Sequence, residues 1–281
     1  RWNGHTMLAL DGSHVQIQSN THDKATHFNS TKDGCGYNLL HLNALYDLEN
    51  QLYLDAVIQN GREEHESRAL VELVDRSRLK EPVIMITDRG YEAYNNIAHI
   101  EQKNWNYLIR AKEKRGILSG LKLPDTPEFD VAFSYFLSKR LTNRIRREPQ
   151  KYRWIPSKVR FDYIKNASDA LYPISFRVVR FAVKDGLYET VITNLPADRF
   201  PPPLLRVLYH KRWGIETSFR DLKHTLALTH FHAKKRPFIE QEIFAKMTLY
   251  NFASLIRLHA VFTQPEGRHL YRINAAFATH I

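Results

Sequence analysis

The sequence predicts a mixed α/β protein, and three observations carry that prediction. Short apolar runs rich in β-branched residues, such as 83–87, are typical of buried strands. Two later segments, 204–226 and 238–258, repeat their apolar residues at helical spacing. The chain has 281 residues, of which 43% are hydrophobic, so it can bury a large core. We therefore expect a folded protein in which strands and helices alternate.

The first sixty residues predict three strands. The apolar run 7–10 indicates a buried strand that ends on Asp11, and 14–17 are expected to continue it. The runs 39–46 and 52–58 favour β-structure and are separated by a polar stretch, so they predict an antiparallel hairpin.

The next fifty residues predict alternating helices and strands. A helix is expected from Glu63, because acidic residues in a first turn suit the helix dipole. The apolar run 83–87 then predicts a buried strand that ends on Asp88. A helix over 92–102 and a further strand over 105–110 follow.

The middle of the chain predicts a basic, β-rich insertion. Residues 111–160 contain thirteen Lys or Arg against five Asp or Glu. This segment therefore carries a formal charge of +8, most of the +11 of the whole chain. Alternating runs over 176–193, with a turn signal at Asp185 and Gly186, indicate short strands. We therefore expect a first core part over 1–110, the insertion over 111–196 and a second core part over 197–281.

A predicted helix after Pro203 carries an unusual set of polar side chains. Tyr209, Arg212, Glu216 and Lys223 fall within about 60° of arc at 100° per residue. Apolar residues form the neighbouring stripe, so this edge borders the buried face of the helix. One carboxylate therefore shares a ridge with two cations and a phenol.

The composition of the chain indicates which kind of partner it binds and in which cellular compartment it works. The formal charge of +11 favours a polyanionic partner, although ribosomal, nuclease and membrane-surface proteins share that bias. Cys35 is the only cysteine, which excludes an internal disulfide and fits the reducing cytoplasm. The stretch 249–262 is too short and too polar to cross a membrane. Arg1 is not an initiator methionine, so we expect the chain to begin inside a longer protein.

Three acidic residues are the candidates for catalysis. Asp11 and Asp88 at strand ends and Glu216 on a helix edge can converge on hard divalent cations, which prefer oxygen ligands. Each has a plainer alternative, because single aspartates cap turns and Glu216 could pair with Arg212 or Arg220. The coincidence of all three favours two-metal phosphodiester chemistry.

These motifs resemble those of the insertion-sequence DDE transposases that carry the YREK signature. Residues 11–13 resemble the first aspartate motif of that family, 88–91 the second, and 193–196 the segment that leads into the third. The signature itself is matched by the Tyr, Arg, Glu and Lys named above. The resemblance implies a ribonuclease H-like mixed sheet flanked by helices, with a β-rich insertion between the second aspartate and the glutamate.

The resemblance also implies a reaction and its cofactor. The three acidic residues would bind two Mg2+ ions, for which Mn2+ can substitute, while Tyr209, Arg212 and Lys223 would hold phosphates near the cleaved end. The reaction would be hydrolysis of a DNA strand followed by attack of the 3′ hydroxyl on another phosphodiester. The implied partners are double-stranded DNA at transposon ends and at the target, and a second copy of the chain in a synaptic dimer. The implied setting is the bacterial cytoplasm, without a membrane, and the amino-terminal end-recognition domain of such proteins is expected to be missing.

The insertion and the histidines supply further candidates. Trp154 is a candidate for stacking on a flipped base, although a half-buried tryptophan is the plainer interpretation. Arg146 and Arg147, with their basic neighbours, are candidates for contact with the DNA backbone. His65 lacks the second histidine one turn on that a zinc helix needs, so we expect it to be solvated or to cap a helix.

Two other functions fit the same sequence. A metal-dependent nuclease or junction resolvase on a ribonuclease H-like fold would cut DNA but not join it. A truncated or domesticated protein would keep the basic surface and bind DNA without activity. Retention of all three acidic residues favours the enzymes.

Overall fold

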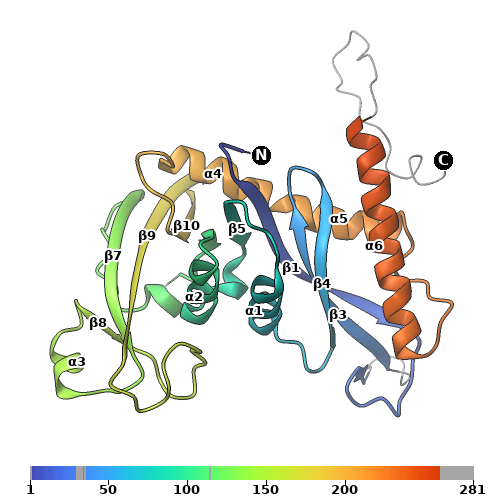
Figure 1. Cartoon of the computed structure of the whole chain (residues 1–281), viewed down its shortest axis with the longest axis horizontal. Helices are drawn as coiled ribbons and strands as arrows, with labels where there is room; N and C mark the ends of the chain where they lie inside the picture. Colours follow the sequence, from blue (N-terminus) through green and yellow to red (C-terminus); the bar gives the residue numbers. More distant parts are fainter. Residues whose placement is uncertain (1, 30–33, 35, 114, 260–281) are drawn as a thin grey trace, which may run out of the picture. The chain divides into compact units, whose positions relative to one another are not determined.

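The computed structural model describes residues 2–29, 34, 36–113 and 115–259. The fold is mixed α/β, with ten strands in this described part and helices beside them (Figure 1). The chain forms two compact units: the first comprises Thr6–Ala69 and the chain from Lys211 onward, and the second comprises Trp2–His5 and Leu70–His210. Cys35 and the end of the apolar stretch 249–262 lie outside the described residues.

The sheet of the first unit is antiparallel. Strand β3 (Tyr37–Asp47) pairs with β1 (Thr6–Ile17) on one side and with β4 (Leu52–Asn60) and the short β2 (His27–Phe28) on the other. The predicted hairpin is confirmed. The expected continuation over 14–17 is confirmed, because β1 extends to Ile17; Asp11 therefore does not end the strand but pairs with Ala44 in its middle. The strand continues because residues 12–17 also pair with β3, and their side chains alternate between the two faces of the sheet.

Two helices supply the rest of the first core. Helices α5 (Trp213–His224) and α6 (Arg236–His259) contribute apolar residues to the cluster formed by β1, β3 and β4. The buried Tyr46 and Tyr250 share a hydrogen bond of 2.9 Å between their hydroxyls. The predicted C-terminal helix is therefore confirmed, and its inner residues cover one face of the sheet.

The second unit contains the predicted strand and helix pairs. Strands β5 (Val83–Thr87) and β6 (Asn106–Arg110) are parallel, and α2 (Tyr94–Gln102) connects them after the short 3-10 helix η1 (Arg89–Tyr91). Helix α1 (Glu66–Arg76) leads from the first unit into the second. His65 caps it, because His65 Nδ1 accepts a hydrogen bond of 3.2 Å from the backbone of Arg68, as the sequence predicted.

The insertion is β-rich and extends the sheet of the second unit. Its strands run in the order β6-β10-β9-β7-β8, with β10 antiparallel to β6. The elements are η2 (Gly116–Leu118), β7 (Phe129–Ser138), α3 (Asn143–Arg147), β8 (Tyr152–Trp154), β9 (Leu171–Lys184) and β10 (Leu187–Thr193). Gly186 turns β9 into β10 with a φ of +71°, a conformation that favours glycine. The insertion boundaries at 111 and 196 stay a prediction.

The predicted signature helix is divided. Helix α4 (Pro202–Lys211) ends just before Arg212, and α5 begins just after it. Arg212 keeps right-handed helical dihedrals, with φ −50° and ψ −35°. Gly214 follows closely, and its low helix propensity weakens a continuous helix at this point. Within the described part of the chain, no helix is long and apolar enough to cross a membrane.

Candidate active site

Asp11 lies on the face of β1 that packs against α5 and α6. Strand residues alternate between faces, and Asp11 shares its face with Ala9 and Val15, which belong to the core that these helices complete. The side chain is 19% exposed. Its Oδ1 accepts a hydrogen bond of 2.9 Å from the backbone N–H of Gly12. The β1–β3 pairing therefore holds a partly buried carboxylate on the inner face of the first unit.

Arg212 joins this carboxylate to the second one. Its guanidinium is 2.7 Å from Glu216 Oε1 and 3.8 Å from Asp11 Oδ2. Arg212 is only 5% exposed, whereas the Glu216 side chain is 37% exposed. One buried cation thus lies between two carboxylates that are far apart in the sequence. The ion pair of Glu216 with Arg212, which the sequence left open as the plainer alternative, is present, and Asp11 takes part in it.

The other two signature residues differ in their exposure. Lys223 lies on α5 and is partly buried, and this burial lowers the pKa of its ammonium group. A lowered pKa reflects a cation that has lost part of its hydration, and a neighbouring anion would offset that loss by direct attraction. Tyr209 on α4 is 2% exposed. The structure therefore gives Tyr209 a packing role, and its contact with phosphate stays a prediction.

Asp88 is the candidate carboxylate of the second unit. It follows β5 directly, as the sequence predicted, and caps η1 by accepting a hydrogen bond of 2.8 Å from the backbone N–H of Gly90. The side chain remains partly exposed. Asp88 is therefore a capping residue, as the plainer alternative expected. The cap uses only Oδ1 of its carboxylate.

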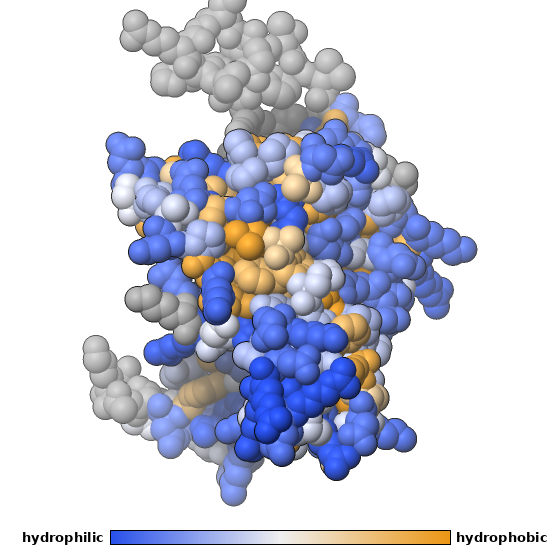
Figure 2. Space-filling view, turned by 90° about the vertical axis from the view of Figure 1, so that its left-hand side faces the viewer, coloured by the Kyte–Doolittle hydropathy of each residue, from blue (hydrophilic) through white to orange (hydrophobic). Residues whose placement is uncertain are grey.

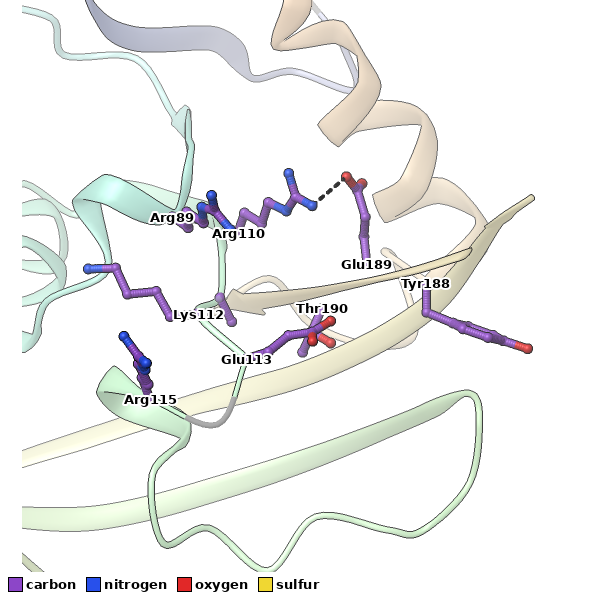
Figure 3. A pocket seen from close by; sticks show the side chains of 9 residues that line it. Arg89, Arg110, Lys112, Glu113, Arg115, Tyr188, Glu189 and Thr190 are labelled. Carbon is purple, nitrogen blue, oxygen red and sulfur yellow. Dashed lines mark ion pairs between the residues drawn. The ribbon is translucent and has the colours of Figure 1, made fainter. Parts of the chain in front are cut away.

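A basic pocket begins at the residue after Asp88. It has a volume of about 440 Å³, and four cationic side chains line it (Figure 3). They are Arg89, Arg110, Lys112 and Arg115. Glu189 pairs with Arg110 at 3.5 Å, and Glu113 is the other acidic residue of the lining. Cations therefore outnumber carboxylates around a hollow large enough for a phosphate group.

The sequence patterns did not predict this pocket. Arg110 is the last residue of β6, and Lys112 and Arg115 lie in the loop that follows this strand. That loop is shaped by the buried Glu92, whose carboxylate accepts hydrogen bonds from the backbone N–H groups of Lys112 and Ile117. Burial raises the pKa of Glu92. One sequence feature could have indicated this pocket. Basic residues directly follow the predicted strand 105–110, and that strand could be expected to pair with the strand that precedes Asp88.

The predicted DNA-contact residues of the insertion lie at its surface. Arg146 and Arg147 are exposed on α3, and Trp154 at the end of β8 is 45% exposed. No carboxylate of the described residues lies within ion-pair distance of either arginine, whereas Arg144 pairs with Glu148 at 3.8 Å. Figure 2 shows the side of the molecule that carries β7, β8 and α3, with strongly hydrophilic residues gathered next to an apolar patch. At this exposure Trp154 is about half-buried, as the plainer alternative expected, and its stacking on a base stays a prediction.

Comparisons with known proteins agree on the fold and the family. No curated protein matches this chain in a sequence search. Among solved structures, the chain is similar to a piggyBac transposase in a synaptic complex with hairpin DNA, with a TM-score of 0.52 and 7% identity. The match covers 90% of this chain and 47% of that chain, so this chain spans about half the length of that transposase. The likeness is one of fold and agrees with a ribonuclease H-like transposase architecture.

The family comparison covers most of the sequence. Residues 2–252 match the family described as "Transposase DDE domain". The match includes all three acidic candidates and the four residues of the signature. Members of this family are catalytic domains that cleave and join DNA strands and generally depend on divalent metal ions. The chain belongs to the Transposase DDE domain family.

Proposed function

We propose that this chain is the catalytic core of an insertion-sequence transposase of the YREK type. It would hydrolyse a DNA strand at the transposon end and transfer the resulting 3′ hydroxyl to another phosphodiester. The observation that carries the proposal is the buried Arg212 guanidinium between Asp11 and Glu216. It supports the proposal because it brings together two of the three acidic residues that the chemistry requires.

The donor set fits hard divalent cations. Asp11 and Glu216 both direct carboxylate oxygens toward the guanidinium of Arg212. Asp88 uses only one carboxylate oxygen to cap η1. Carboxylate oxygens are the ligands that hard divalent cations prefer. These three residues would hold two Mg2+ ions, with Mn2+ as a substitute. When bound, the ions would supply activation of the attacking oxygen and compensation of charge on the leaving 3′ oxygen.

The basic side chains would hold and orient the DNA. Arg212 would contact a phosphate through its guanidinium, and Lys223 on α5 offers a point charge. The pocket next to Asp88 would neutralise backbone phosphates that lie near this carboxylate. Arg146 and Arg147 would extend the contact along the duplex, and Trp154 would stack on an unpaired base.

The proposed partners are double-stranded DNA and a second copy of the chain. The piggyBac relative was solved as a synaptic complex with DNA, which supports a dimer that holds two transposon ends. Bacterial cytoplasm is the proposed setting.

Cleavage of the element's own end by matched variants tests the function. We expect the wild type with Mg2+ or Mn2+ to nick labelled end DNA, and Asp11→Asn, Asp88→Asn and Glu216→Gln to bind the same DNA without nicking it. Each substitution removes a carboxylate charge at nearly constant volume. Asp185→Asn, in the exposed turn between β9 and β10, serves as the control and should nick like the wild type.

The outcomes separate the alternatives. Strand transfer from a labelled 3′ hydroxyl end distinguishes a transposase from a nuclease or resolvase that only cuts. Equal nicking by wild type and Asp88→Asn would refute the assignment of the acidic residues. DNA binding without any nicking by the wild type would favour the non-catalytic alternative.

A further inference from the structure

Two histidines and a glutamate meet on the face of the first sheet that lies opposite Asp11. His14 and His41 are directly paired across β1 and β3, and their rings are 5.0 Å apart between centroids. Glu64 reaches them from the segment before α1, with Oε2 2.6 Å from His14 Nε2. One ligand atom from each residue lies within 4.8 Å of the other two.

The register explains why these side chains converge. His14 pairs with His41, and His41 pairs with Gln59 on β4, so the three residues form one row across three strands. Gln59 Oε1 accepts a hydrogen bond of 2.9 Å from the backbone N–H of His65. That bond turns the chain after β4 back over the row and brings Glu64 to His14. The cluster is therefore held by three strands and a fixed turn.

The surroundings of His41 resemble a prepared ligand site. The His41 side chain is buried, so its position is fixed by the surrounding strands. A Cβ on Gly12 would lie 2.5 Å from His41 Nε2, so only glycine leaves room for this ring. The Asn43 side chain is fully buried beside it, and its Oδ1 has no hydrogen-bond donor among the described residues. A water molecule on a bound cation could donate to this oxygen.

We propose that His14, His41 and Glu64 form a binding site for one late first-row divalent cation of the Zn2+ class. Two imidazoles and one carboxylate are a common zinc donor set and leave a coordination position for water. Metal–ligand bonds of about 2.1 Å require ligand atoms no more than about 4.2 Å apart, so small side-chain movements close the site. The cation would replace the proton shared by His14 and Glu64.

This site is separate from the acidic residues of the proposed active site. Asp11 faces α5 and α6, whereas His14, three residues later, faces the other side of β1. The donors also differ, because imidazole suits Zn2+ whereas Mg2+ prefers oxygen. The bound cation would join β1, β3 and the segment before α1, and would stabilise the first unit by mass action.

Direct metal titration of the full chain tests the site. Protein stripped with chelator is titrated with Co2+, followed by its visible absorption, and with Zn2+ in competition with a chromogenic chelator. We expect one equivalent to bind, millimolar Mg2+ not to displace it, and Zn2+ to raise the melting temperature. His14→Ala and Glu64→Gln change exposed side chains, so they should fold and should lose more affinity than the about 10–100-fold typical of an outer-sphere partner.

Two further variants sharpen the result. Gly12→Ala removes no ligand but displaces the His41 ring, so it should weaken Co2+ binding. His22→Ala removes an exposed histidine outside the cluster and should bind like the wild type. The proposal is overturned if the stripped wild type binds no stoichiometric Co2+ or Zn2+, or if His14→Ala and Glu64→Gln bind as tightly as the wild type. Asp88→Asn should bind Co2+ and Zn2+ like the wild type although it should not nick DNA. The metal titration can therefore fail or succeed independently of the nicking assay.

Discussion

Replacement of Arg212 with methionine tests whether one buried cation holds two carboxylates together. Arg212 is 5% exposed and pairs with Glu216 at 2.7 Å and with Asp11 at 3.8 Å. Its guanidinium also lies 5.2 Å from the ring centroid of Trp213. Methionine keeps most of the apolar stem and removes all three interactions.

The cost follows from the burial of each partner. Removal of one partner from a fully buried ion pair costs about 3–5 kcal/mol, since the remaining charge is left uncompensated. Asp11 and Glu216 are 19% and 37% exposed, so water compensates part of that loss. Trp213 is 52% exposed, which places its cation–π contribution at about 0.5–1 kcal/mol. We expect a net loss of about 2–4 kcal/mol.

Thermal unfolding followed by circular dichroism measures this loss. An unfolding entropy of about 2.1 cal/mol/K per residue gives about 0.6 kcal/mol/K for 281 residues, so a loss of this size lowers the melting temperature by roughly 3–7 °C. Arg220→Met is the matched control, because Arg220 is exposed on α5, which begins directly after Arg212, and this variant should melt within about 2 °C of the wild type. Buried pairs are screened little by salt, so the difference should persist in 0.5 M NaCl, roughly three times physiological ionic strength. Equal melting temperatures for Arg212→Met and the wild type would show that the guanidinium does not hold the two carboxylates.

Three further predictions concern the second unit. The double variant Arg146→Ala and Arg147→Ala should weaken DNA binding at all sequences and reduce the slope of log K against log salt by about 2, measured by fluorescence anisotropy; an unchanged slope would exclude both as phosphate contacts. Trp154→Ala should abolish quenching of 2-aminopurine at the transposon end, whereas Trp154→Phe should keep part of it, and equal quenching by all three proteins would rule out stacking. Burial raises the pKa of Glu101 to about 7 from 4.5, although Tyr107 donates a hydrogen bond to it. Folding therefore favours its protonated form, so stability should fall as pH rises from 4.5 to about 7, and Glu101→Gln should flatten this part of the urea-unfolding profile; identical profiles would contradict the shift.

Local features of this protein were predictable because neighbouring residues determine them. An apolar β-branched run followed by Asp88 and Gly90 specifies a strand and its capped end, and the structure contains both. His65 caps α1 for the same kind of reason, since the bond joins residues three apart. Helical spacing of apolar residues likewise predicted α6, although the split at Arg212 shows that one amphipathic pattern can continue across a break.

Residue types along the chain specify where acidic, basic and β-forming side chains stand, whereas packing between distant segments specifies which of them come into contact. Pairing with β3 places Asp11 in the middle of β1. Helix α5 packs against the same sheet, and Arg212 at its start therefore lies between Asp11 and Glu216. The same register places His14 opposite His41 on the other face. A period of two shows which side chains share a face of a strand, but the partner strand and its register depend on packing between distant segments.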